Sequence, residues 1–268
     1  MTAARWFGVG RSETGHVRQT NQDAFAAINS RFVWVVADGM GGHPAGDLAA
    51  RTAVDAITEQ SRVPPGTVAD KQSSGEAMVA GLITAANEAI HDKIQADPKL
   101  KGMGTTIVTM TIRSRPSPTA YVGHLGDSRA YRYHEGTLTQ LTRDHTMVER
   151  FIQRGLITPE EAKTHPDRHV LIKGLGMGRG LKPDVSATPI VEGDLLLLCS
   201  DGLTKMLEDA EIAAILARAK NNPRRTCHDL IERALAKGGE DNVTAIVCAH
   251  TVPTKSGSLA IDKTPTAM

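Results

Sequence analysis

Short apolar runs and longer segments of helical periodicity alternate along this chain of 268 residues, with polar turns between them. Residues 32–37, "FVWVVA", form a continuous apolar run of strand length. The runs "LLLLC" at 195–199 and "VTAIVCAH" at 243–250 have the same character. The pattern therefore predicts buried β-strands at all three places.

Helical periodicity marks several of the intervening segments. Residues 47–60 place their apolar side chains on one side of a predicted helix. A second helix is expected to begin at a capping box formed by Ser73 and Glu76, and to end where Pro98 stops it. Further helical segments are predicted at 146–163, 208–219 and 223–237.

The period changes to that of strands between residues 105 and 141, where four short β-like runs are separated by tight links. Successive short strands of this kind predict an antiparallel meander. The segment 164–184 is rich in Gly, His and Arg, and its length predicts a mobile flap beside a site. The tail from Thr251 has no periodicity and is predicted to be disordered.

Charge and composition exclude several classes of function. The chain has 31 basic and 30 acidic residues, so it lacks the basic surplus that nucleic acid or an anionic membrane surface would attract. No apolar stretch approaches the ~20 residues of a membrane span, and the polar N-terminus has no signal-peptide core. Three cysteines without CxxC spacing indicate neither zinc nor disulfides. The sequence predicts a cytoplasmic protein that binds neither nucleic acid nor membrane.

Acidic residues recur where the apolar runs begin or end. Strands of one core bring their ends together, so side chains at these ends can share a pocket. A fifth acid, Asp23, lies close to the first of these runs without ending it. The four acids at the ends of runs are Asp38-Gly39 after 32–37, Asp127-Ser128 after "AYVGHLG", Asp201-Gly202 after 195–199, and Asp241-Asn242 before 243–250.

Electrostatics then limits what such a pocket can contain. Two unit charges ~5 Å apart repel by roughly 3 kcal/mol at an effective dielectric constant of ~20. Clustered carboxylates must therefore be protonated in part or surround a cation. Oxygen ligands without His or Cys select hard ions, and the absence of a DxDxDG loop favours Mg²⁺ or Mn²⁺ over Ca²⁺. Each acid taken singly is also typical of a turn, and this alternative stays open.

Seven motifs in order connect the chain to a known family: "VRQTNQDA", "VVADGMGGHPAGDLA", "GMGTTIV", "VGHLGDSRAYRY", "LTRDHT", "LLLCSDGL" and "DNVTAIV". Together they resemble the metal-dependent protein phosphatases (PPM, type 2C) in their compact bacterial form. The resemblance implies an α+β fold, a β-sandwich of two antiparallel sheets flanked on both sides by helices. It also implies one phosphatase domain over residues 1–250, followed by the tail at 251–268.

The resemblance implies roles for the acids in binding Mn²⁺ or Mg²⁺. Asp38 would bridge two tightly bound ions, and the backbone carbonyl of Gly39 would complete one of them. Asp201 and Asp241 would hold the other ion, so that these two and Asp38 are the catalytic carboxylates. Asp23 would act through metal-bound water.

Two further residues match family positions outside the two tightly bound ions. Asp127, together with Asp201, corresponds to a weaker third metal site of bacterial members. Arg18 falls where the family uses an arginine to clamp the substrate phosphate, a task that guanidinium geometry suits. Two departures are Gln22, which replaces a glutamate of some relatives, and Met40, which replaces a histidine proposed as general acid in eukaryotic members. His43 is a weak alternative acid.

The implied activity is hydrolysis of phosphoserine and phosphothreonine in proteins by a metal-bridged hydroxide, without a Cys or Ser nucleophile. The protein would be a monomer that acts on phosphorylated proteins and opposes a Ser/Thr protein kinase in bacterial signalling. Two alternatives remain open from the sequence. One is a catalytically weak adaptor of the same fold that binds phosphoproteins, and the other is a metal-dependent phosphodiesterase.

Overall fold

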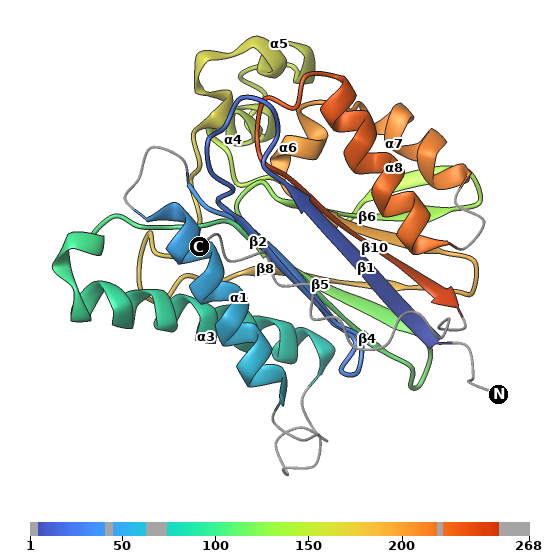
Figure 1. The fold of residues 1–268 in the computed structure, drawn as a ribbon, viewed down its shortest axis with the longest axis horizontal. Coiled ribbons are helices and arrows are strands. Elements are labelled where there is room, and N and C mark those ends of the chain that lie inside the picture. The colour runs from blue at the N-terminus through green and yellow to red at the C-terminus, as the bar shows by residue number, and fades with distance from the viewer. Residues whose placement is uncertain (1–4, 41–44, 63–73, 219–221, 252–268) are drawn as a thin grey trace.

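Two five-stranded antiparallel sheets pack face to face in the computed structural model, which describes residues 5–40, 45–62, 74–218 and 222–251 (Figure 1). The strands are β1 (Arg5–Glu13), β2 (Asp23–Ile28), β3 (Val33–Asp38), β4 (Ile107–Arg113), β5 (Thr119–Leu125), β6 (Arg129–His134), β7 (Thr137–Gln140), β8 (Asp184–Pro189), β9 (Leu195–Cys199) and β10 (Val243–Thr251). One sheet has the order β1-β10-β9-β6-β7, and the other has the order β2-β3-β4-β5-β8.

Helices cover the outer face of each sheet. The helices are α1 (Gly46–Arg62), α3 (Gly75–Ala96), α4 (Met147–Gln153), α5 (Pro159–Thr164), α6 (Asp201–Thr204), α7 (Asp209–Ala217) and α8 (Pro223–Ala236), with short 3₁₀ turns η1 (Pro98–Leu100) and η2 (Pro166–His169). In Figure 1, α1 and α3 lie against the sheet that contains β2, while α7 and α8 lie against the sheet that contains β1. The α+β sandwich expected from the sequence is confirmed.

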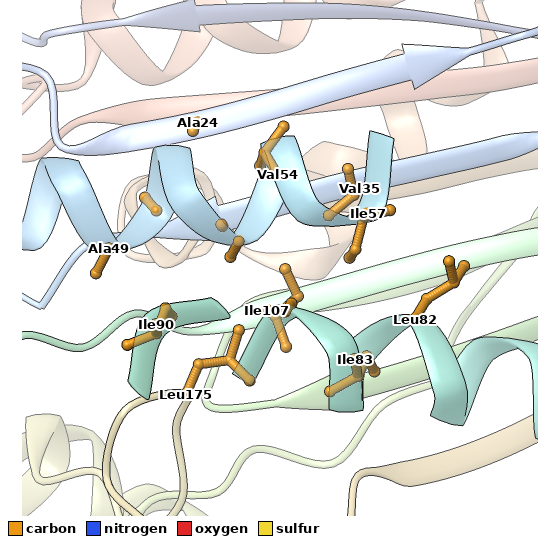
Figure 2. Close-up of a cluster of buried hydrophobic side chains, with 14 of the residues drawn as sticks. Ala24, Val35, Ala49, Val54, Ile57, Leu82, Ile83, Ile90, Ile107 and Leu175 are labelled. Atoms are coloured by element: carbon orange, nitrogen blue, oxygen red, sulfur yellow. The ribbon is translucent and has the colours of Figure 1, made fainter. Parts of the chain in front are cut away.

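The continuous apolar runs arise because the central strands are buried on both faces. In β3, Val33 and Val35 pack under α1 and α3, while Trp34 and Val36 point into the space between the sheets. Figure 2 shows the first of these clusters, with Ile57 of α1 among its side chains. A strand with a helix on one side and a second sheet on the other has no solvent face that would require polar residues.

The expected meander over residues 105–141 is wrong in its connectivity. Strands β4 and β5 pair with each other, but β6 and β7 belong to the opposite sheet. The chain crosses between the sheets at Gly126, which has φ +109°, a conformation that favours glycine. This crossing brings Asp127 to the end of the sandwich. The periodicity contained no signal that distinguishes a tight hairpin from a change of sheet.

Three strands were not predicted from the sequence. Strand β1 contains two glycines, β2 is rich in alanine, and β8 is a half-exposed edge strand, so none has a strong apolar signature. Strand β1 nevertheless forms one edge of its sheet, where it pairs with β10 over nine residues from Arg5↔Thr251 to Glu13↔Val243.

The helix predicted at 146–163 is two helices, α4 and α5, separated by a turn in which Gly155 has φ +66°. Helix α5 begins with a capping box between Thr158 and Glu161. Helix α3 is capped by Ser74, whose hydroxyl accepts a hydrogen bond from the backbone of Ala77. The predicted cap, Ser73, lies outside the described residues.

The predicted flap at 164–184 lies beside the pocket described below, but it is not a free loop. The backbones of Leu175 and Thr105 exchange two hydrogen bonds, of 2.9 and 3.2 Å, and the Leu175 side chain is fully buried. Asn87 of α3 accepts a hydrogen bond from Gly176 and donates one to Gly178. These contacts tie the segment to the core.

The predicted disordered tail lies outside the described residues, apart from Thr251, which ends β10. None of the helices in the described part of the chain is both long enough and apolar enough to cross a membrane.

Gly126→Ala should destabilise the protein more than a change of backbone preference alone would. A Cβ at Gly126 would lie 2.6 Å from Cβ of Thr106, whereas a Cβ at Gly136, which also has positive φ (+89°), would meet nothing within 4 Å. We expect Gly136→Ala to lower the free energy of unfolding by about 1 kcal/mol and Gly126→Ala by about 2–4 kcal/mol, measured by urea denaturation. Equal losses would show that the crossing is not sterically tight.

Candidate metal centre

A pocket of about 650 Å³ opens at one end of the sandwich. Four of the acids found at strand ends line it together with Gly39, Gln22 and Arg18; the acids are Asp38, Asp127, Asp201 and Asp241. Asp23 does not line the pocket, because it lies at the start of β2, directly opposite Asp38 in the strand register, and its side chain is only 2% exposed. The structure thus brings the predicted acids to one end of the sandwich.

Asp38 is the last residue of β3, and its backbone is fixed on both sides. Its N–H donates to the hydroxyl of Thr106 over 3.1 Å, and its carbonyl accepts from the N–H of Thr106 and the hydroxyl of Thr105, each over 2.8 Å. The Thr106 hydroxyl lies 2.7 Å from that of Ser128, in the crossing turn that carries Asp127. Thr105 and Thr106 thus hold the backbone of Asp38 in place.

Gly39 has no room for a side chain. A Cβ there would lie 2.4 Å from the carbonyl oxygen of Gly46, at the start of α1, and 2.8 Å from that of Gln22. The N–H of Gly39 donates to Gln22 over 3.1 Å. Glycine is therefore required where the strand end, the helix start and the chain before β2 converge.

Asp23 connects the two sheets at the base of the site. One carboxylate oxygen, Oδ2, accepts hydrogen bonds from Ser200 (2.8 Å) and Thr244 (2.6 Å), which belong to the β9 end and to β10. The other oxygen, Oδ1, is buried, and none of the residues that the structure describes gives it a hydrogen bond. Burial raises the pKa of Asp23 to about 7, although the two hydroxyls oppose the shift.

Asp38 and Asp127 also have raised pKa values. Burial is the largest cause for Asp38, and the negative charges of Asp23 and Asp201 add to it. Burial raises the pKa of Asp127 to about 8, with a further contribution from Asp201. Carboxylates in this environment hold protons near neutral pH unless positive charge is supplied.

Asp201 and Asp241 are the two acids that already have cationic partners. Nζ of Lys205 lies 2.6 Å from Oδ2 of Asp201 and 3.0 Å from Oδ2 of Asp241. Arg18 reaches Asp241 with both Nε (2.9 Å) and Nη2 (3.0 Å). Burial alone would raise the pKa of Asp241, but Lys205, the backbone of Asn242 and Arg18 outweigh it and lower that pKa.

The donor set fits a hard divalent ion. The acids offer only carboxylate oxygens, and two of these that are buried, Oδ1 of Asp23 and Oδ1 of Asp201, have no hydrogen-bond partner among the described residues. Within the described residues, however, no group of three or more His, Cys, Asp or Glu side chains is arranged closely enough to hold a metal ion. Lys205 and Arg18 instead contact the carboxylates of Asp201 and Asp241.

The roles of Lys205 and Asn242 in the site were not predicted from the sequence. Asn242 accepts a hydrogen bond from the backbone of Gln22 and donates two, to the carbonyls of Thr14 and Thr20, so it holds the loop that carries Arg18. Lys205 follows Asp201 by four residues in "DGLTK", a spacing that pairs opposite charges on one side of a helix turn. That spacing was the available signal.

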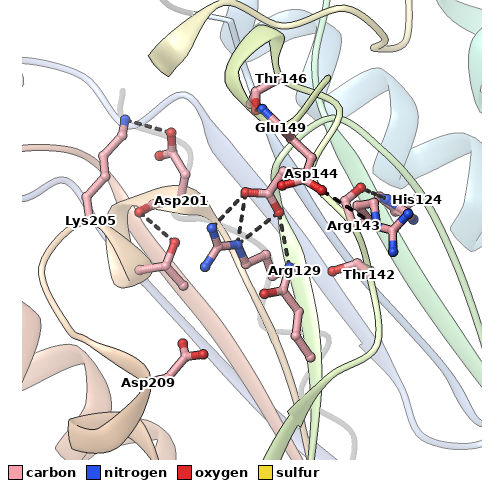
Figure 3. Close-up of polar contacts among 12 residues, drawn as sticks. His124, Arg129, Thr142, Arg143, Asp144, Thr146, Glu149, Asp201, Lys205 and Asp209 are labelled. Atoms are coloured by element: carbon pink, nitrogen blue, oxygen red, sulfur yellow. Dashed lines mark hydrogen bonds and ion pairs between the residues drawn. The ribbon is translucent and has the colours of Figure 1, made fainter. Parts of the chain in front are cut away.

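The remaining candidates have mostly structural surroundings. Arg129 makes a bidentate contact with Asp144 (Figure 3) and also donates a hydrogen bond to the hydroxyl of Tyr131. His169 and Met40 line the pocket. His43 lies outside the described residues.

Comparison with known proteins identifies the family. The sequence profile described as protein phosphatase 2C matches residues 10–237. The chain belongs to the protein phosphatase 2C family. Its serine/threonine protein phosphatase relative PstP of Mycobacterium tuberculosis is 36% identical over 239 residues, which cover 88% of this chain and 43% of PstP. The chain thus spans less than half the length of that relative.

Other serine/threonine phosphatases match over nearly the whole length of the compared chain. The serine/threonine phosphatase stp of Listeria monocytogenes is 32% identical over 88% of this chain and 93% of its own. The crystal structure of the PstP catalytic domain in complex with two manganese ions has a TM-score of 0.79 at 33% identity, covering 92% of this chain and 99% of that one. Stp1 of Staphylococcus aureus has a TM-score of 0.82 at 31% identity, covering 93% and 97%.

The raised pKa values predict that the metal-free protein loses stability as pH rises. The folded state retains protons on Asp23 and Asp127 up to about pH 7 and 8, while the unfolded chain releases them near the ordinary value of 3.8. His124 and His145, whose pKa values burial lowers, act in the opposite direction only below about pH 6.5. Between pH 6.5 and 8.5 we therefore expect the melting temperature without metal to fall by roughly 5 °C.

Added Mn²⁺ should raise the melting temperature more at pH 8.5 than at pH 6.5, because the deprotonated site binds cations better. Differential scanning calorimetry in EDTA and in Mn²⁺ measures both effects. A metal-free melting temperature that rises through this window would contradict the assigned environment of the carboxylates.

Proposed function

We propose that this chain is a metal-dependent phosphatase that hydrolyses phosphoserine and phosphothreonine in proteins. The observation that carries the proposal is the set of acids at one end of the sandwich, with four of them lining a pocket and two buried oxygens lacking partners. Membership of the protein phosphatase 2C family supports the reaction, and the names of the relatives support the substrate.

Within this proposal, two Mn²⁺ or Mg²⁺ ions are held by Asp38, the Gly39 carbonyl, Asp201 and Asp241. Asp23, which lies beneath the pocket, contributes to the same centre. Divalent ions at such a site lower the pKa of water and neutralise the charge of a phosphoryl group. Asp127, with Asp201, holds a third and weaker ion. The backbone bonds that fix Asp38 preserve the geometry that this chemistry requires.

Arg18 is proposed to bind the substrate phosphate. Its side chain is 45% exposed at the lip of the pocket, and the contact with Asp241 holds its guanidinium there. A guanidinium can offer two parallel N–H groups to a phosphate monoester. Met40, Val170, Leu171 and Met177 give the pocket an apolar side, which limits the access of bulk water around a bound phosphoester.

We further propose that residues 1–250 constitute one phosphatase domain and that its substrates are the phosphoproteins made by a Ser/Thr protein kinase. The pairing of β1 with β10, which joins the two ends of the described chain, supports a single domain. The kinase, the monomeric state, the cytoplasmic location and the disorder of the tail at 251–268 stay predictions.

Turnover of a phosphothreonine peptide by the purified chain tests the proposal. We expect phosphate release with Mn²⁺, loss of release in excess EDTA, and recovery when Mn²⁺ is restored. A phosphodiester such as bis-p-nitrophenyl phosphate should be hydrolysed far more slowly than p-nitrophenyl phosphate. Binding of the phosphopeptide without turnover would favour the adaptor, and preference for the diester would favour the phosphodiesterase.

Asp38→Asn should lower kcat/KM for the phosphopeptide by at least about 100-fold, because both tightly bound ions lose their shared ligand. The variant should remain folded, since the substitution replaces the buried carboxyl group of Asp38, whose pKa is already raised, with a neutral amide. Asp229→Asn is the matched control, because Asp229 pairs with Arg225 on the surface of α8. Near-native turnover by Asp38→Asn with Mn²⁺ would contradict the assignment.

Asp127→Asn should separate the weaker ion from the two tighter ones. We expect activity to fall by about 10-fold while isothermal titration calorimetry still detects two bound Mn²⁺ ions. Loss of the tightly bound ions in this variant would place Asp127 in the main centre instead.

A further inference from the structure

Lys205 places a positive charge between two of the proposed metal ligands. Its Nζ contacts Oδ2 of Asp201 over 2.6 Å and Oδ2 of Asp241 over 3.0 Å, and its side chain is only 29% exposed. Figure 3 shows the lysine reaching over the turn to Asp201. Neither contact is a chance surface pairing, since one ammonium group joins acids that are forty residues apart in the chain.

The turn that carries Lys205 is held rigidly against the start of β10. A Cβ at Gly202 would lie 2.0 Å from the carbonyl oxygen of Asn242, so the backbones of α6 and of the segment before β10 are in close contact. The side chain of Leu203 is fully buried, and the N–H of Lys205 donates to the carbonyl of Asp201 over 2.7 Å. The fold therefore fixes the backbone of Lys205 relative to Asp201 and Asp241, within reach of both carboxylates.

The oxygens of the two acids are nearly all used by these cations and by the backbone. Oδ2 of Asp201 accepts from Lys205, and Oδ2 of Asp241 accepts from both Lys205 and Arg18. Oδ1 of Asp241 accepts from Arg18 and from the N–H of Asn242, so that within the described part of the chain only Oδ1 of Asp201 has no hydrogen-bond partner. A divalent ion that binds Asp201 through both oxygens, or Asp241 through Oδ2, must therefore compete with the ammonium group of Lys205.

We propose that Lys205 is a tethered cation that competes with the divalent ion for Asp201 and Asp241, and thereby sets the metal concentration at which the site fills. This inference rests on the proposed metal centre. An ammonium group and a divalent ion cannot share the same oxygens at close range without strong mutual repulsion. Lysine suits the role because its charge sits on a flexible four-carbon stem that can swing away.

The same contacts make Lys205 a stabiliser of the metal-free protein. Without the ammonium, Asp201 would lose its only cationic partner among the described residues and face the charges of Asp38 and Asp127 directly. Lys205 therefore has opposite effects on two measurable quantities: it stabilises the metal-free fold and weakens metal binding. A residue with a purely structural role would lower both stability and metal affinity when it is removed.

Removal of the ammonium in Lys205→Met tests the inference by two readouts that do not require turnover. Isothermal titration calorimetry should show Mn²⁺ binding about 5- to 50-fold more tightly than in the wild type, the range of one to two ion pairs in a partly buried site. The melting temperature in EDTA should fall, and saturating Mn²⁺ should restore it to the wild-type value. Lys205→Gln, which keeps a polar end, guards against a packing fault and should show the same signs.

Two controls make the result specific. Lys237→Met removes a lysine that pairs with Glu211 outside the pocket, and it should leave Mn²⁺ affinity unchanged. Lys205→Arg keeps the positive charge and should bind Mn²⁺ no more tightly than the wild type. Unchanged or weaker Mn²⁺ binding in both Lys205→Met and Lys205→Gln would overturn the inference.

Failure of the inference can be distinguished from failure of the metal centre itself. If the wild type binds Mn²⁺ and Asp38→Asn does not, the centre stands whatever the Lys205 variants show. If neither the wild type nor the Lys205 variants bind Mn²⁺, both the centre and the competition are refuted. Tight binding in the Lys205 variants alone would be the strongest support, since the lysine would then be the barrier to loading.

Discussion

Buried negative charge is the constraint on which the rest of this structure depends. Asp23, Asp38 and Asp127 lie in surroundings that raise their pKa values, and a carboxylate in such a place costs several kcal/mol unless positive charge or hydrogen bonds compensate it. Among the described residues, Lys205 and Arg18 form ion pairs with Asp201 and Asp241 but with none of these three, although the charge of Lys205 opposes part of the pKa rise of Asp127. The site is therefore organised around a need for positive charge that a hard divalent ion can meet.

The residues that create this demand also hold the two sheets together. Asp23 belongs to β2, yet its hydrogen bonds come from Ser200 and Thr244 of the opposite sheet. The hydroxyls of Thr106 and Ser128 make a second connection, between the backbone of Asp38 and the turn that crosses from one sheet to the other. The stability of the fold and the chemistry of the site thus depend on the same residues at this end of the sandwich. A substitution there that changes one is expected to change the other.

Much of the fold was readable from local pattern. The apolar runs that became β3, β9 and β10 were recognised because strands buried on both faces need no polar alternation. Strands β1 and β2 were missed because glycine and alanine give a weak signal, although pairing with strong partners makes them part of the sheets. The change of sheet after β5 was also missed, since it depends on one backbone angle at Gly126.

The sequence by itself determined the chemistry of the site: acids at the ends of apolar strands, in an order that resembles one family. Only the tertiary structure decided how these acids are arranged and what opposes their charge. It placed Asp23 beneath the pocket and Lys205 between Asp201 and Asp241. The physical reason is range: hydrophobic periodicity is set by neighbours a few residues apart, whereas Arg18 and Asp241 are 223 residues apart and meet only when both sheets have packed.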